Sequence, residues 1–269
     1  MRTTIVAEIG ANHLGDMGLA EAMIRAAADA GADMVKCQSW QARKLRKNFP
    51  AFEETFERHR RTELSDDDHR RLIDCCKRHG VEFLTTCFDI ERVEFLAGLG
   101  LKTIKVASPD CGSLKLLDRL MDAFDHLVIS TGMSTDDEVL AMIERTRGHR
   151  VTVLHCVSLY PTPPERVNME RMLWLRSLDV PVGFSDHTLG TEAATLAIAL
   201  GAELVEKHFT LSRSLPGKDQ AMSGEPPEFA KLRQWAEAVE RLRGSAHPGL
   251  SDEETALRHV YVGKWGDNR

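Results

Sequence analysis

The stretch "GTEAATLAIALGAELVEKHF" at residues 190–209 contains the pattern that decides the fold. Its first half, up to Gly201, carries small and apolar residues at helical spacing. A glycine at the end of such a run is typical of a helix C-cap. Leu204 and Val205 then begin a short apolar run, and three ionisable residues follow them. The stretch therefore predicts a helix followed directly by a buried β-strand with polar chemistry at its carboxyl end.

The same unit recurs along the whole chain. Short apolar runs suited to strands occur at residues 3–10, 33–38, 82–88, 103–108, 126–131, 151–157, 181–186 and 203–209. Helical patterns separate these runs, and their continuous apolar character suits strands that are covered on both faces. The first run is not followed by the GxGxxG fingerprint of a dinucleotide-binding open sheet. We therefore predict an α/β fold of the (β/α)₈ TIM-barrel type.

Two segments depart from this regular alternation. Residues 39–63 form a long connection after the second predicted strand, and long connections in compact domains are often functional, so we expect an active-site flap there. Residues 251–263 carry a helical pattern near the end of the chain. The predicted domains are a TIM-barrel synthase domain at residues 1–243 and a C-terminal helix and tail at residues 244–269.

Length and composition are those of a globular protein. The 269 residues are 42% hydrophobic and 28% charged, and the formal net charge of −6 gives no reason to expect a nucleic-acid partner. No apolar run is long enough to cross a bilayer, and the first residues enter a strand directly, so we expect a cytoplasmic protein without a membrane partner. The six cysteines include no CxxC pair and are expected to be buried thiols.

Polar side chains gather at the carboxyl ends of the predicted strands, where (β/α)₈ barrels have their active sites. They include Glu8, Lys36, Gln38, Thr86, Lys105, Ser108, Asp110, Ser130, Ser158, Tyr160, Ser185, His187, Glu206 and His208. Each of them alone has a structural explanation, such as an ion pair or a satisfied backbone group. Together, two lysines, two histidines and several hydroxyls predict an anion site beside a divalent-metal site.

Strand alternation separates the three ionisable residues that end the eighth predicted strand. Glu206 and His208 are two residues apart and therefore share the face toward the barrel mouth. Lys207 points the other way, and we expect it to have a structural role. His187 ends the neighbouring strand, and imidazole is a common ligand of divalent metals. His187 and His208 are therefore candidate metal ligands.

The order of several motifs resembles that of a known family. The segments "AEIGANHLGD", "LTTCFD", "GFSDHTLG" and "VEKHFTLSRSLPGKDQ" occur here in the order seen in sialic acid (N-acetylneuraminate) synthases. The likeness covers almost the whole chain. The resemblance implies the condensation of phosphoenolpyruvate with an open-chain N-acetylhexosamine such as N-acetylmannosamine. The product is a 2-keto-3-deoxy sugar acid of the nonulosonate type, phosphate is released, and a divalent metal, Mn²⁺ or Mg²⁺, is required.

The resemblance also assigns roles to residues of this sequence. It implies that His187 and His208 bind the metal and that Glu8, Glu206 and Tyr160 are catalytic. The implied substrate-binding residues are Lys36, Gln38, Thr86, Lys105, Ser108, Asp110, Ser158, Ser185 and Asp219. The implied partners are phosphoenolpyruvate and an aldose-type acceptor, and a homodimer is the implied assembly.

The sequence also departs from the family pattern. Ser158 stands where asparagine is common, and "GKDQ" at residues 217–220 keeps Asp219 but adds Lys218. The family continues into a C-terminal antifreeze-like domain that gives the partner subunit an arginine, and we expect this protein to lack that domain. A different or phosphorylated aldehyde is therefore an alternative acceptor, as in deoxyoctulosonate or deoxyheptulosonate synthases, and Lys218 and Arg213 would suit its phosphate. A non-catalytic barrel is a further alternative, which the retained lysines and histidines disfavour.

Overall fold

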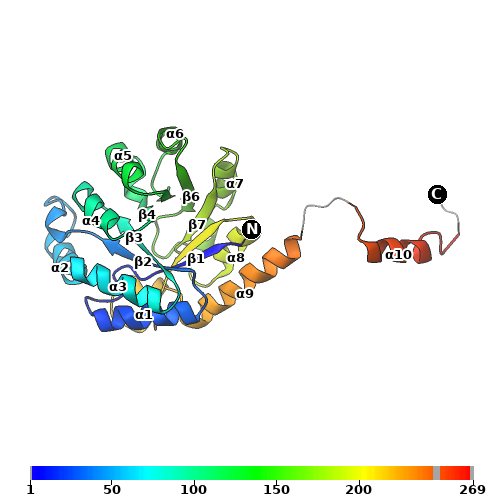
Figure 1. Ribbon diagram of the computed structural model, residues 1–269, viewed down its shortest axis with the longest axis horizontal. Helices are drawn as coiled ribbons and strands as arrows, with labels where there is room; N and C mark the ends of the chain where they lie inside the picture. Colours follow the sequence, from blue (N-terminus) through cyan, green and yellow to red (C-terminus); the bar gives the residue numbers. More distant parts are fainter. Residues whose placement is uncertain (1, 245–248, 267–269) are drawn as a thin grey trace.

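A closed barrel of eight parallel strands forms the centre of the molecule (Figure 1). The structure is a computed structural model that describes residues 2–244 and 249–266. The strands are β1 (Thr4–Glu8), β2 (Met34–Ser39), β3 (Glu82–Cys87), β4 (Thr103–Val106), β5 (His126–Ser130), β6 (Arg150–Cys156), β7 (Val182–Asp186) and β8 (Leu204–His208). They pair in sequence order, and β8 closes the barrel by pairing with β1. The predicted TIM barrel is therefore confirmed.

Helices surround the strands, as Figure 1 shows. They are α1 (Met17–Asp29), α2 (Phe52–Thr62), α3 (Asp66–Arg78), α4 (Val93–Gly98), α5 (Leu114–Ala123), α6 (Asp136–Arg145), α7 (Glu170–Arg176), α8 (Glu192–Ala199) and α9 (Pro226–Arg243). α2 is an extra helix beyond the regular alternation of one strand and one helix, and it occupies much of the long connection after β2. That connection was expected to be a flap, and it is instead largely helical.

Strand alternation divides the barrel interior into two layers. Six aliphatic residues pack together inside the barrel, namely Val6, Met34, Leu84, Val128, Leu154 and Leu204. Two residues farther along most of these strands, the inward position is polar, as at Glu8, Lys36 and Glu206. The apolar layer therefore seals the barrel and forms the floor beneath a layer of polar side chains at the carboxyl ends of the strands.

Gly183 in β7 shows how tightly the apolar layer is packed. A Cβ atom at this position would lie 2.3 Å from the carbonyl oxygen of Leu204 and 2.5 Å from Cδ2 of Leu154. Only glycine therefore leaves room for the neighbouring strand and for the Leu154 side chain.

The space between strands and helices forms a second and larger apolar core. All six cysteines are buried and free, as expected, and they behave as small apolar residues. α3 begins with a capping box in which Ser65 and Asp68 satisfy each other's backbone amides. No helix among the described residues is long and apolar enough to span a membrane.

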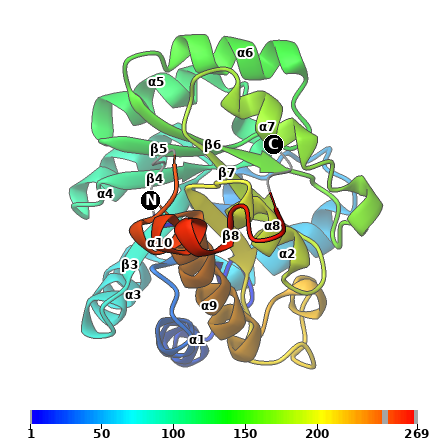
Figure 2. The ribbon, with the colours of Figure 1, turned by 90° about the vertical axis from the view of Figure 1, so that its right-hand side faces the viewer.

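The end of the described chain forms α10 (Asp252–Tyr261), a helix within the segment where a helical pattern was noted. Ser251 and Glu254 form a capping box at its start. None of its residues is buried, and Figure 1 shows it apart from the barrel. Figure 2, turned toward that side, shows α10 in front of the barrel.

Candidate active site

The polar layer at the carboxyl ends of the strands lines a small inner pocket of about 80 Å³. The predicted residues that line it are Glu8, Lys36, Gln38, Thr86, Lys105, Ser108, Tyr160, Ser185, His187, Glu206 and His208. A larger outer cavity of about 690 Å³ shares Gln38, Tyr160 and His208 with it and is also lined by Asp219. The barrel therefore brings most of the predicted site together in two adjoining hollows.

Four buried charges form the base of the inner pocket. Lys36 Nζ lies 2.8 Å from Glu8 Oε2 and 3.5 Å from Glu206 Oε2. Lys105 Nζ lies 3.9 Å from Glu206 Oε1 and donates a hydrogen bond of 2.7 Å to Ser130. Burial of charge is costly unless each group is paired, and here two cations face two carboxylates. The network holds all four side chains in fixed positions.

The two carboxyl groups differ in their affinity for a proton. Burial raises the pKa of Glu8 to about 7, although Lys36 opposes this shift and Glu206 adds to it. Burial acts in the same direction on Glu206, but Lys105, Lys36 and the Ser185 hydroxyl outweigh it and lower its pKa to about 2. Glu206 is therefore a permanent carboxylate, whereas Glu8 is suited to exchange a proton near neutral pH.

The lysines are arranged to receive an anion from the mouth of the barrel. Burial lowers the pKa of Lys105. Burial acts similarly on Lys36, but Glu206 and Glu8 outweigh it and raise the pKa of Lys36. Thr86 accepts a hydrogen bond of 3.1 Å from Lys36, which places a hydroxyl beside the cation. Ammonium groups with neighbouring hydroxyls are suited to phosphate and carboxylate oxygens.

The predicted metal ligands His187 and His208 lie side by side, with ring centroids 5.6 Å apart. His187 Nδ1 lies 2.8 Å from the carbonyl oxygen of Val157, which leaves Nε2 for a ligand. His208 Nδ1 is buried without a hydrogen-bond partner, and burial lowers the pKa of His208 well below its usual value. Burial acts in the same direction on His187, but its contacts with Cys156 and Val157 outweigh burial and raise the pKa of His187. Two adjacent imidazoles, each with a ring nitrogen free of hydrogen bonds, fit a divalent metal. The described residues contain no group of three side chains that could complete a metal shell.

Tyr160 and Ser108 occupy the rim of the inner pocket. The Tyr160 ring lies 4.1 Å from the His187 ring, measured between centroids, and forms part of the wall of both hollows. Ser108 Oγ accepts a hydrogen bond of 3.1 Å from the amide of Gly132. A Cβ atom on Gly132 would lie 2.4 Å from Ser158 Oγ, so glycine is required there.

Two predicted substrate-binding residues lie outside the walls of both hollows. Ser158 Oγ is buried against Gly132 and has no hydrogen-bond partner, and Ser158 lines neither hollow. Asp110 accepts a hydrogen bond of 3.0 Å from Ser113 in the loop before α5 and also lines neither hollow. Ser158 lies two residues after the end of β6 and Asp110 lies four residues after the end of β4, and in both loops the path of the backbone sets the direction of the side chain.

Several residues of the site were not selected from the sequence. Cys156 is the last residue of β6 and lines the inner pocket. Ser130, which was noted among the polar strand-end residues without an assigned role, also lines this pocket. In the outer cavity, one face of α2 forms a wall through Glu54, Glu57, Arg58 and Arg61. Their spacing of three and four residues places them on one helical face, but the segment was predicted only as a flap.

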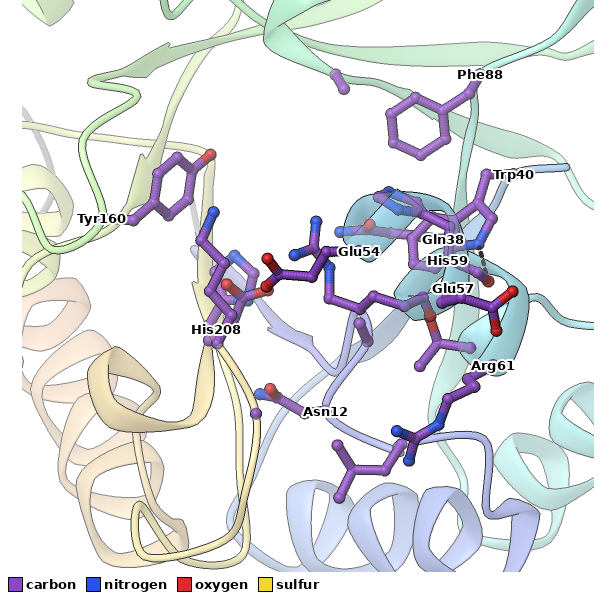
Figure 3. Close-up of a pocket in the computed structure, with 18 of the residues that line it drawn as sticks. Asn12, Gln38, Trp40, Glu54, Glu57, His59, Arg61, Phe88, Tyr160 and His208 are labelled. Atoms are coloured by element: carbon purple, nitrogen blue, oxygen red, sulfur yellow. Dashed lines mark hydrogen bonds between the residues drawn. The ribbon is translucent and has the colours of Figure 1, made fainter. Parts of the chain in front are cut away.

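Figure 3 shows the outer cavity between two groups of side chains. Tyr160 and His208 lie on one side, and Trp40, Phe88, Glu57 and Arg61 lie on the other. Trp40 follows β2 and donates a hydrogen bond of 3.0 Å to the carbonyl oxygen of His59 in α2. This contact, together with the edge-on packing of the two rings, attaches α2 to the barrel.

Two basic residues near the site have structural partners. Lys207 Nζ lies 2.9 Å from Asp186 Oδ2 in a fully buried ion pair, as the expected structural role requires. Arg213 binds Glu228 and donates a hydrogen bond of 3.0 Å to the carbonyl oxygen of Ser223. Arg213 does not line the outer cavity, and its pairing with Glu228 disfavours the suggestion that it binds an acceptor phosphate.

Comparisons with known proteins agree on one family. The NeuB family profile matches residues 23–248. The chain is 36% identical to N,N'-diacetyllegionaminic acid synthase of Legionella pneumophila, over 96% of this chain and 78% of the relative. It is 34% identical to human N-acetylneuraminate-9-phosphate synthase, over 90% of this chain and 71% of the relative. The crystal structure of N-acetylneuraminic acid synthetase from Leptospira borgpetersenii superimposes with a TM-score of 0.90 at 31% identity, covering 97% of this chain and 93% of that one.

Proposed function

The chain belongs to the NeuB family and is an acid synthase of that family, and from this premise we propose that it condenses phosphoenolpyruvate with an N-acetylhexosamine-like aldose. The product is a 2-keto-3-deoxy sugar acid of the nonulosonate type, and inorganic phosphate is released. One observation carries the proposal: a pocket with two buried lysines and two buried carboxylates opens into a larger cavity. The named products of the relatives support a sugar acid as the product.

Phosphoenolpyruvate fits the inner pocket by charge. Its phosphate and carboxylate are anionic, and Lys36 and Lys105 are the buried cations that face them. Thr86, Ser108 and Ser185 add hydroxyl donors around the same pocket. The acceptor would then occupy the outer cavity, with Tyr160 and Asp219 along its path.

His187 and His208 would hold the divalent metal, Mn²⁺ or Mg²⁺, at the boundary between the two hollows. Their free ring nitrogens and their position support this role. When bound there, the metal supplies Lewis-acid polarisation of the acceptor's carbonyl group. The hydrogen bond to Val157 fixes the orientation of the His187 ring.

The reaction needs one proton relay, which we assign to Glu8. C3 of phosphoenolpyruvate bonds to the aldehyde carbon, and water adds to the electron-poor C2. Glu8 takes one proton of this water and delivers a proton to the former aldehyde oxygen. The bond between C2 and the phosphate oxygen then breaks, the second proton leaves with the phosphate, and a ketone remains. The pKa of about 7 suits Glu8 to this task better than Glu206, which stays ionised beside its lysines.

The direct test is the release of phosphate from phosphoenolpyruvate. We expect release only when an aldose and Mn²⁺ or Mg²⁺ are both present, in a screen of N-acetylhexosamines, simple aldoses and their 6-phosphates. No release with any acceptor, together with no calorimetric binding of phosphoenolpyruvate, would contradict the proposal. The homodimer and the cytoplasmic location remain predictions, and light scattering tests the first of them.

A further inference from the structure

The carboxyl group of Asp219 lies at the outer cavity without a hydrogen-bond partner. Asp219 lines this cavity in the loop after β8, and burial raises its pKa although Lys218, Arg58 and His187 oppose the shift. Within the part of the chain that the structure describes, no group donates a hydrogen bond to this carboxyl or forms an ion pair with it. The position of the carboxyl group therefore depends on the backbone that carries it.

Ser223 holds the backbone at Asp219. Ser223 Oγ donates a hydrogen bond of 2.7 Å to the carbonyl oxygen of Asp219 and accepts one of 2.9 Å from Asn12 Nδ2. Asn12 Nδ2 donates a second hydrogen bond of 2.9 Å to the carbonyl oxygen of Phe209, so both of its hydrogens are used. Asn12 lies in the loop after β1, and Figure 3 shows it at the outer cavity. These contacts therefore join the loop after β8 to the loop after β1.

Gln220 makes a second connection between the same two loops. Its Nε2 donates a hydrogen bond of 3.0 Å to the carbonyl oxygen of Asn12, and its Oε1 is hydrogen-bonded to the Thr210 hydroxyl. A Cβ atom on Gly217 would lie 3.2 Å from Gln220 Cγ, so the loop passes closely over this side chain. Gln220 directly follows Asp219, and both ends of its amide group are fixed.

Asn12, Thr210, Gln220 and Ser223 form a buried loop network beneath an exposed part of the same loop. The exposed fraction is 2% for Asn12 and 0% for the other three, whereas residues 216–218 are exposed. Buried polar groups cost free energy unless they are hydrogen-bonded, and hydrogen bonds also impose direction. The loop network therefore fixes one path for the backbone at Asp219.

We propose that Gln220 and Ser223 are positioning residues that hold the Asp219 carboxyl group against the acceptor. The inference rests on the proposed function, which places the acceptor in the outer cavity beside Asp219. A carboxyl group without a protein partner is available to the hydroxyls of a sugar. Neither Gln220 nor Ser223 lines either hollow, so each acts through Asp219 and not by contact with substrate.

The test is a double-mutant cycle in the phosphate-release assay with Mn²⁺ and N-acetylmannosamine, or with the aldose of the screen that turns over best. Asp219→Ala, Gln220→Met and Ser223→Ala should each lower kcat/KM for the acceptor by about tenfold to a hundredfold, the effect of a displacement of about 1 Å. KM for phosphoenolpyruvate should stay unchanged. Adding Gln220→Met or Ser223→Ala to the Asp219→Ala protein should cause no further loss, because the positioned group is already absent.

Thr152→Val is the matched control. It removes a buried hydroxyl that is hydrogen-bonded to His126 at 2.9 Å, at the amino-terminal end of the barrel. Like Gln220→Met, it should lower the melting temperature, but it should leave kcat/KM unchanged. Ser223→Ala is the milder of the two network variants and keeps the test available if Gln220→Met does not fold.

Two outcomes would overturn the inference and leave the proposed function in place. One is wild-type kcat/KM in folded Gln220→Met and Ser223→Ala. The other is a loss of the same size with and without Asp219, since the network would then act on the fold and not through this carboxyl group. If no acceptor turns over, the same cycle is measured as calorimetric binding of N-acetylmannosamine with phosphoenolpyruvate present. Weaker binding in each single variant, with no further loss in the double variants, supports the inference; equal affinities or no binding refute it.

Discussion

Replacement of Lys36 by methionine tests the central charge network of the inner pocket. Lys36 is 3% exposed and lies 2.8 Å from Glu8 and 3.5 Å from Glu206. The variant keeps most of the side-chain volume but leaves two buried carboxylates that only Lys105 faces. Removing one partner of a buried ion pair typically costs about 3–5 kcal/mol. With an unfolding entropy of about 2.1 cal/mol/K per residue, that corresponds to a fall in melting temperature of roughly 5–9 °C for this chain.

The loss of stability should depend on pH. Lys36 opposes the upward shift of the Glu8 pKa, so its removal raises that pKa above the present value of about 7. A carboxyl group whose folded pKa exceeds its unfolded value binds more protons when folded, and its contribution to stability therefore falls as pH rises between the two values. The difference in unfolding free energy between wild type and Lys36→Met should accordingly be larger at pH 8 than at pH 5.5, as measured by urea denaturation.

Lys207→Met provides a matched control for this experiment. Lys207 is as deeply buried as Lys36 and lies 2.9 Å from Asp186, but it does not line the inner pocket. Both variants should lose stability, whereas only Lys36→Met should lose phosphate release at temperatures where both are folded, by about a hundredfold or more if Lys36 contacts the anionic substrate directly. The reasoning is refuted if Lys36→Met retains turnover, or if the two variants lose turnover equally while folded.

Three further predictions concern the metal, the histidine pair and the barrel floor. Incubation with EDTA should abolish phosphate release, and added Mn²⁺ should restore it; activity that resists EDTA would count against the metal site. His208→Ala should abolish turnover with little change in circular dichroism or melting temperature, and retained turnover would remove His208 from the metal site. Gly183→Ala should destabilise the fold by about 3 kcal/mol in urea denaturation, because the added Cβ overlaps Leu204 and Leu154; an unchanged midpoint would refute the packing argument.

The sequence alone was sufficient to predict the barrel. Apolar periodicity and glycines at helix ends are local signals, and each reports on a few neighbouring residues. Eight strand–helix units predict a parallel barrel, and in a parallel barrel the carboxyl ends of all strands lie on the same face. This is why Lys36, Lys105, His187, Glu206 and His208 could be grouped as a site before the structure was known.

The direction of loop side chains and the pKa values of buried groups could be learned only from the tertiary structure. Asp110 and Ser158 lie in loops after their strands, where Asp110 is held by Ser113 and Ser158 is packed against Gly132, so neither lines the hollows. Glu8 and Glu206 are the same chemical group, and their opposite pKa shifts arise from lysines on other strands. The face of α2 that lines the outer cavity depends on tertiary structure as well, because Trp40 holds this helix beside the cavity through its hydrogen bond to His59. Electrostatics and side-chain direction depend on residues far apart in the chain, whereas secondary structure depends mainly on near neighbours.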